Sequence, residues 1–494
     1  MAMISKVGLV LIGVVLSFRS ASAQTATLLP LTTKSAKAHR LLEQAWDLGI
    51  DQVEQEKAIR VLRKALKADP NFAMAHEILA QISLEPSEQV SERQKATATK
   101  RNASLAEQAI IDWFQNAADH NLIPAITNMN DALRQYPHDR WVVYLSSNWL
   151  AKQTQYDRAA AIYEHSGMTD SPGLMNNTAY TYASIRQFDK AFILMDKYVA
   201  ALPKDANPQD SYAEILRMDG RFEKAIEHYK AALTINPGFY SSQFGIADTY
   251  SLMGDQVRAR QEYDLGFRKF SLPELHRIQW RTREAITYVR DGNITAADAA
   301  FQAIADHAHT KKMSQVEADT YRQMAMYQPH SHQALLFLAK AEAALHEGSN
   351  AMPGLIQQEL AQILRARVEL ALRIADEQTA EANLAELAAL SDNSNDKLIE
   401  TAYHGAAGAL LFSGQDYKDA VLHLEEDIHN PLSLKLLVIA YRQMGDISES
   451  KQVGDTLADL NDPTLEQAIV VPAFRKCIQN AACDSIIKTA SLQH

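Results

Sequence analysis

The sequence predicts an all-α protein, a right-handed α-solenoid of stacked helix-turn-helix repeats that become degenerate toward the C-terminus. A pattern of small, aromatic and turn residues recurs with a period near 34 residues, which is typical of stacked helical hairpins. Only 18 Gly and 15 Pro occur in 494 residues, which argues against a sheet-rich or disordered chain. Long Ala-, Leu- and Glu-rich stretches such as 356–390 predict helix throughout.

The repeat pattern is clearest in residues 211–237. Gly220, Ala225, Tyr229, Ala232 and Pro237 stand at −5, 0, +4, +7 and +12, counted from the alanine. Small residues at 0 and +7 allow two helices to approach closely, and the aromatic residue at +4 fills the space between neighbours. Glycine at −5 suits a left-handed cap on the first helix, and proline at +12 ends the second helix. Each unit is therefore predicted to be one helical hairpin.

The same register extends in both directions along the chain. Successive marker alanines from Ala125 to Ala259 lie 34, 32, 34 and 34 residues apart, and Ala58 begins an earlier unit. Degenerate units follow, marked by Ala297, Ala334, Ala380, Ala420 and Ser450. The polar stretch 88–104 is expected to be a loop or an exposed helix start. We predict five segments: a signal peptide at 1–23, a helical region with one repeat-like unit at 24–115, a regular array at 116–275, degenerate repeats at 276–460 and a C-terminal cap at 461–494.

These marks resemble the signature of the tetratricopeptide repeat family. The matching residues are Ala213, Leu216, Gly220, Phe222, Ala225, Tyr229, Ala232 and Pro237. The resemblance is specific for residues 125–270 and weaker at 40–82 and from 292 onward. It implies a scaffold that binds a protein or peptide, with no cofactor and no chemistry of its own.

The N-terminus predicts export to the periplasm or secretion. Lys6 precedes an apolar run from Val7 to Phe18, and Ala21-Ser22-Ala23 supplies small residues for cleavage after Ala23. The run is too short for a transmembrane helix, so no membrane span is expected after cleavage. The alternative is an N-terminal anchor that stays uncleaved. The net charge of −11 makes nucleic acid an unsuitable partner.

The concave face of the array is the predicted binding surface, because the first helix of each hairpin lines that face. Positions 18, 15, 11 and 8 before each marker alanine point there. From these rows we select nine candidate peptide-binding residues: Tyr144, Asn148, Asn176, Tyr180, Asp210, Glu214, Arg217, Phe244 and Asp248. Amide side chains suit the backbone of an extended peptide, and aromatic rings offer flat apolar contacts. The alternative for each residue is packing against an adjoining helix.

The charges in these rows favour a neutral or basic extended partner, because Asp210, Glu214 and Asp248 are acidic. A subtype of the family clamps a peptide's terminal carboxylate with basic residues and asparagines. Asn148 and Asn177 fall at the matching asparagine places, but the basic places hold Tyr144, Asn207 and Ser211. This departure argues against a carboxylate clamp.

The sequence offers no recognisable catalytic or metal motif. The His-Glu pairs at 76–77 and 346–347 lack the second histidine of a metalloprotease helix. The pairs His307/His309 and His330/His332 are expected to be exposed rather than to bind metal. An enzyme or enzyme subunit with a site in 275–400 remains the alternative function, and a sugar- or polymer-binding accessory protein a third. Cys477 and Cys483, a close pair in an exported chain, are predicted to form a disulfide.

Overall fold

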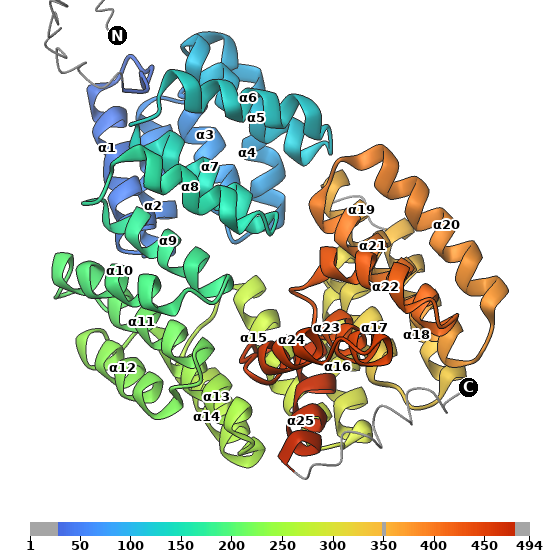
Figure 1. Ribbon diagram of the computed structural model, residues 1–494. Helices are drawn as coiled ribbons and strands as arrows, with labels where there is room; N and C mark the ends of the chain where they lie inside the picture. Colours follow the sequence, from blue (N-terminus) through green and yellow to red (C-terminus); the bar gives the residue numbers. More distant parts are fainter. Residues whose placement is uncertain (1–27, 348–351, 480–494) are drawn as a thin grey trace, which may run out of the picture.

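The structure is a computed structural model that describes residues 28–347 and 352–479, and all regular structure in these two ranges is helical (Figure 1). The first part of the chain contains α1 (Ala36–Trp46), α2 (Gln55–Ala68), α3 (Ala73–Ile82), α4 (Pro86–Thr99), α5 (Leu105–Ala118), α6 (Leu122–Gln135), α7 (Arg140–Lys152), α8 (Tyr156–Ser166), α9 (Pro172–Ser184), α10 (Phe188–Ala201), α11 (Asn207–Met218), α12 (Phe222–Ile235), α13 (Tyr240–Met253) and α14 (Gln256–Lys269). The second part contains α15 (Glu274–Arg290), α16 (Ile294–Thr310), α17 (Ser314–Tyr327), α18 (Ser331–Glu347), α19 (Pro353–Arg373), α20 (Glu377–Ser394), α21 (Lys397–Ser413), α22 (Tyr417–Leu424), α23 (Pro431–Met444), α24 (Ile447–Ala458) and α25 (Leu465–Gln479). Short π- and 3₁₀-helical turns lie at Asp47–Asp51, Lys100–Asn102 and Glu425–Asp427.

Consecutive helices pair as antiparallel hairpins, and the hairpins stack into the predicted right-handed α-solenoid. The prolines at +12 act as expected: Pro70, Pro137, Pro203 and Pro237 each follow the last residue of a second helix by two positions. The marker alanines are fully buried, including Ala225 and Ala259. The apolar core is correspondingly a series of clusters, each shared by neighbouring hairpins. The expected fold class is confirmed.

A left-handed residue lies five positions before the marker of most hairpins, whether or not it is glycine. Gly220, Gly254, Gly292 and Gly445 have φ of 76°, 92°, 70° and 89°. Other residues take the same conformation at the equivalent position: Val53, His120, Thr154, Arg186, Ala375 and Gln415. Since left-handed backbone is costly for residues with a Cβ, the packing of the two helices imposes this turn even where the sequence does not favour it.

Two local expectations were only partly right. Residues 88–104 are mostly helix, because α4 pairs with α3 and buries Glu92, Arg93 and Ala96 despite its polar composition. The stretch 356–390 is not one helix, because α19 ends at Arg373 and α20 begins at Glu377. Ala375, with φ of 56°, makes the left-handed turn that separates the two helices of this hairpin. In both places tertiary pairing overrides the local composition.

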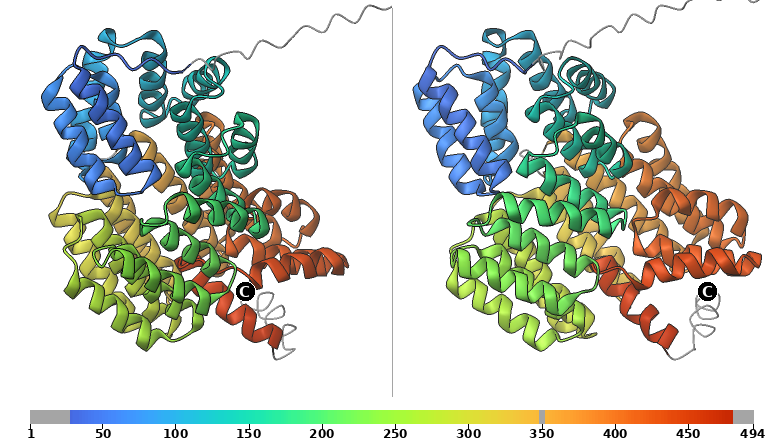
Figure 2. Two further views of the ribbon diagram at one scale, coloured as in Figure 1. Left: turned by 90° about the vertical axis from the view of Figure 1, so that its left-hand side faces the viewer. Right: turned by 60° about the vertical axis from the view of Figure 1, so that its left-hand side comes forward.

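The array curls back on itself, so hairpins far apart in the sequence meet (Figures 1 and 2). Helix α5 contacts α19, and α15 contacts α25. The turn at Asp47–Asp51 packs against the start of α9, where the Asp51 carboxylate accepts a hydrogen bond of 2.9 Å from the amide of Gly173. This docking places the start of α2 over the concave face of the regular array. In the ranges that the structure covers, no helix has both the length and the apolar character needed to cross a membrane.

Candidate functional site

The concave face of the regular array contains a groove of about 450 Å³. First helices α9, α11, α13 and α15 form its floor, as the solenoid geometry requires. The start of α2, over residues 53–60, forms one wall. The turn between α12 and α13 forms another, and the Tyr240 hydroxyl there lies 2.8 Å from Nδ1 of His276 on α15. The groove is therefore enclosed by segments from three parts of the chain.

Five of the nine candidate residues line this groove: Asn176, Tyr180, Asp210, Glu214 and Asp248. They lie on α9, α11 and α13, in the register expected from the marker alanines. Tyr180 donates a hydrogen bond of 2.9 Å to Oε2 of Glu214. The Oδ1 atom of Asn176 is buried and accepts no hydrogen bond in the described part of the chain. A groove-lining acceptor of this kind is open to a donor from water or from a bound molecule.

The structure places the other four candidates outside the groove lining. Tyr144 packs edge-on against Trp46, with ring centroids 5.5 Å apart, and burial raises the pKa of its hydroxyl to about 12. Asn148 donates to the side chain of Asn177 at 3.2 Å. Phe244 is fully buried behind the floor and stacks on Trp280 at 4.8 Å. These side chains pack between helices, which was the alternative weighed for each of them.

Arg217, the fourth, is buried under a segment from the C-terminal part of the chain. Its guanidinium donates to the backbone carbonyl of Asn461 at 2.6 Å and to Glu214 at 3.2 Å. The side-chain amide of Asn461 donates in return to the carbonyl of Met218. The non-helical stretch after α24 therefore covers the concave face beside the groove. This cover comes from residues about 240 positions away, which no local pattern indicates.

The three groove carboxylates differ in how they are compensated. Asp248 accepts hydrogen bonds from the Tyr263 hydroxyl and from Arg283. Glu214 is held by Tyr180 and Arg217. Asp210 accepts a hydrogen bond of 2.6 Å from Ser242, and within the described residues it makes no ion pair. Burial raises the pKa of Asp210 to about 7, because ionising a desolvated carboxyl is costly and the Ser242 hydrogen bond and the charge of Arg217 offset this only in part.

Sequence reasoning missed the part of the floor on α15 and the wall at residues 53–60. Gln279 lies 18 residues before Ala297, so the concave register extended by one more unit would have found it. Arg283 and Trp280 neighbour that position on α15. No sequence pattern indicates the wall at residues 53–60, because this segment reaches the groove only through the curvature of the whole array.

The remaining sequence predictions concern cysteine and metal. Cys477 is buried on α25, whereas Cys483 lies outside the described residues, so the disulfide stays a prediction. The signal peptide at 1–23 also lies outside them. His307 contacts Glu274, and His309 lies 3.1 Å from Glu317. No group of three or more metal-binding side chains gathers anywhere in the described ranges.

Comparisons with known proteins agree with the repeat pattern. The family model described as "Tetratricopeptide repeat" matches residues 211–239. A search of curated proteins gives no match. One similar solved structure is the APC/C hetero-tetramer Cut9–Hcn1, with 13% sequence identity, a TM-score of 0.41, and 83% of this chain and 78% of that chain covered. Another is yeast Tom70, with 14% sequence identity, a TM-score of 0.39, and 92% of this chain and 99% of that chain covered. A third is YrrB, a TPR protein with an unusual peptide-binding site, with 13% sequence identity, a TM-score of 0.25, and 42% of this chain and 96% of that chain covered.

The family match falls on the hairpin that shows the repeat signature most completely, α11 and α12. The same hairpin geometry, with its left-handed turn and buried small residues, recurs on both sides of it. Residues 211–239 therefore form a tetratricopeptide repeat within an array of similar helical hairpins.

Proposed function

We propose that this protein is an exported, non-catalytic scaffold that binds an extended, neutral-to-basic segment of a partner protein in the groove between α2, α9, α11, α13 and α15. Tetratricopeptide repeats are protein-interaction modules, and their concave surface is the usual place of binding. Export rests on the sequence of residues 1–23 alone.

The charge of the groove supports a basic segment. Its lining contains five carboxylates and three permanent cations: Glu54, Glu56, Asp210, Glu214 and Asp248 against Lys57, Arg60 and Arg283. With His276 neutral and Asp210 ionised, five negative and three positive charges leave −2. Asp210 is the groove carboxylate that makes no ion pair in the described part of the chain, and it is 7% exposed. A lysine or arginine from a partner would complete this pair in a partly desolvated site, where charge-assisted hydrogen bonds are strong.

Polar and aromatic groups support an extended backbone. The unpaired Oδ1 of Asn176 suits a backbone amide of the bound segment. Tyr180 is partly buried and fixed by Glu214, so its ring is held in place before binding. Rigid aromatic contacts lose little conformational entropy when a ligand binds.

We assign binding rather than catalysis to the concave face. The alternative site in 275–400 would fall near a second pocket, lined by Arg365 and Glu369 among others. The residues that line this pocket include no histidine or cysteine. Its Ser433 donates to Asp427 at 2.6 Å and accepts from Arg365, and the same Asp427 oxygen pairs with Arg365 at 2.7 Å, which makes Asp427 a weak base for activating the serine.

The experiment is a titration of the mature protein with matched extended peptides that differ only in one central residue, lysine, norleucine or glutamate. We expect the lysine peptide to bind most tightly and the glutamate peptide least. Asp210→Asn should remove about tenfold or more of the lysine preference, since hydrogen bonds to charged groups are worth about 1.5–3 kcal/mol. Affinity for the lysine peptide should also rise as the pH increases through about 7, because Asp210 ionises over that range.

The matched control is Asp264→Asn, which neutralises an exposed carboxylate on α14 that pairs only with Arg268. This variant should bind the three peptides like the wild type. Equal affinity for the lysine and glutamate peptides, or an unchanged lysine preference in Asp210→Asn, would show that the groove does not select for charge in this way. N-terminal sequencing of protein recovered from the producing cell tests cleavage after Ala23.

A further inference from the structure

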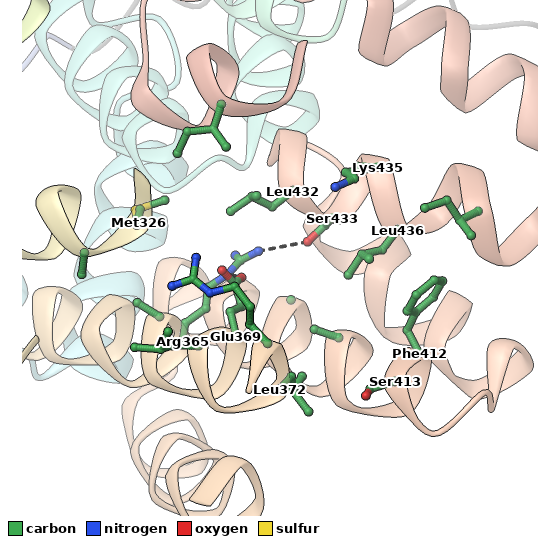
Figure 3. Close-up of a pocket in the computed structure, with 18 of the residues that line it drawn as sticks. Met326, Arg365, Glu369, Leu372, Phe412, Ser413, Leu432, Ser433, Lys435 and Leu436 are labelled. Carbon is green, nitrogen blue, oxygen red and sulfur yellow. Dashed lines mark hydrogen bonds and ion pairs between the residues drawn. The ribbon is translucent and has the colours of Figure 1, made fainter. Parts of the chain in front are cut away.

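A second concave space lies in the C-terminal half of the array, apart from the groove. It has a volume of about 390 Å³ and is lined mainly by residues of α17, α19, α21 and α23, the first helices of successive hairpins, and by Leu338 of α18. Ile469 of α25 borders it. Figure 3 shows side chains of α19 and α23 on opposite sides of this space, which we name the inner pocket.

The inner pocket is mainly apolar. Its apolar lining comes from every one of these helices and includes Met326, Leu338, Leu370, Leu372, Phe412, Leu432, Leu436, Ile439 and Ile469. The volume falls within the range of about 300–1,000 Å³ that small-molecule sites occupy. A pocket of this size and composition suits the hydrocarbon part of a small ligand.

One cation in the inner pocket is fully compensated by the protein. Arg365 on α19 pairs with Asp427 at 2.7 Å and donates to Ser433 at 3.0 Å and to Glu369 at 2.9 Å. Gly405 on α21 makes room for it, since a Cβ there would lie 2.5 Å from the guanidinium carbon. The buried Arg365 side chain therefore links α19 to Asp427 and to α23, and stabilises this side of the inner pocket.

Two further cations lack such compensation. Lys435 lies on α23, beside Leu432 and Leu436 in Figure 3, and makes no hydrogen bond or ion pair within the described ranges. Burial lowers the pKa of Lys435, with no carboxylate to oppose the effect. Arg373, at the end of α19, makes no ion pair there either, and burial lowers its pKa against the opposing charge of Glu369.

The charged side chains that line the inner pocket have a positive net charge, although the chain as a whole is strongly acidic. The lining holds three cations, Arg365, Arg373 and Lys435, and one carboxylate, Glu369, which gives +2. Asp427, behind Arg365, reduces this to +1. The whole chain carries −11, and the groove lining carries −2. The inner pocket thus carries one positive charge in excess, which a single anion would balance.

We infer that the inner pocket binds a small amphipathic monoanion, such as an aliphatic carboxylic acid, with its hydrocarbon chain among the leucines and its carboxylate on Lys435. The apolar wall and the uncompensated ammonium group stand on the same helix, one turn apart. A peptide groove of opposite charge would then share the scaffold with a separate small-molecule site.

The test uses three probes of equal chain length at concentrations below micelle formation: decanoate, decanol and decylammonium. Isothermal titration calorimetry of the full mature protein should show one molecule of decanoate bound, more tightly than decanol and much more tightly than decylammonium. Lys435→Met should lower the affinity for decanoate about tenfold or more and leave that for decanol nearly unchanged. The ratio of the decanoate affinity to the decanol affinity is insensitive to a small folding defect, because such a defect weakens the binding of both probes.

Two variants serve as controls. Lys418→Met removes an exposed lysine of α22 outside the inner pocket and should keep the decanoate preference. Leu436→Trp should fill the inner pocket and weaken both decanoate and decanol, while peptide binding in the groove stays as in the wild type. Equal binding of decanoate and decylammonium, or a decanoate preference that survives Lys435→Met, would overturn the inference. Decanoate affinity unaffected by Leu436→Trp would also overturn it.

Discussion

Substituting alanine for two buried helical glycines tests the close packing of hairpins directly. Gly266 lies on α14 at the +7 position, and a Cβ there would lie 2.7 Å from Cζ and 2.8 Å from Cε1 of Phe244. Gly454 lies on α24, and its nearest neighbour would be Cζ of Phe474 at 3.5 Å, an ordinary contact. The same chemical change therefore meets a clash in one helix and open packing in the other.

The expected magnitudes follow from two opposing effects. Alanine in place of glycine inside a helix stabilises by about 1 kcal/mol, which is the whole effect expected for Gly454→Ala. At Gly266 the Phe244 ring would have to move by roughly 1 Å to reach normal contact distances of about 3.5–4.0 Å. Phe244 is fully buried and stacked on Trp280 at 4.8 Å, so overpacking should cost about 1–3 kcal/mol. Gly266→Ala should thus be about 1–3 kcal/mol less stable than Gly454→Ala.

Guanidinium unfolding followed by circular dichroism at 222 nm measures both variants against the wild type. Midpoints are compared rather than extrapolated free energies, because long repeat arrays depart from two-state behaviour. If Gly266→Ala proves as stable as Gly454→Ala, the close approach of α13 and α14 is incorrect and the role assigned to the +7 small residue fails.

Three further predictions concern the turns, the groove and the cysteines. Thr154 has φ of 55° in a left-handed turn; Thr154→Gly should raise stability by about 0.5–1 kcal/mol, as the relief of strain exceeds the added chain entropy, and a lower melting temperature would contradict this. The folded pKa of Asp210, near 7, lies above its unfolded value near 4, so its burial lowers stability as pH rises from about 4 to about 7. Asp210→Asn should therefore melt higher than the wild type at pH 8, with the difference vanishing near pH 4; a constant difference would rule out this titration. Thiol titration of the unfolded, unreduced mature protein should find neither Cys477 nor Cys483 reactive, and two titratable thiols would contradict the predicted disulfide.

The sequence by itself determined the hairpins and their register. Buried alanines such as Ala225 and helix-ending prolines such as Pro237 appear where the period near 34 residues places them. These features are local, since each follows from contacts between helices adjacent in the chain. The same register predicted that Asn176, Tyr180 and Asp210 would share one concave face, because that face depends only on helical periodicity.

Only the tertiary structure decided which part of the concave face is open. The wall at residues 53–60 comes from the docking of Asp51 on Gly173, and the cover over Arg217 comes from Asn461. Both result from the curvature of the whole array, in which small rotations between successive hairpins add up until distant ones touch. No local pattern encodes that sum. The left-handed turn at Thr154 and the burial of Phe244 are also tertiary effects, because packing between neighbouring helices outweighs the local preference of the sequence there.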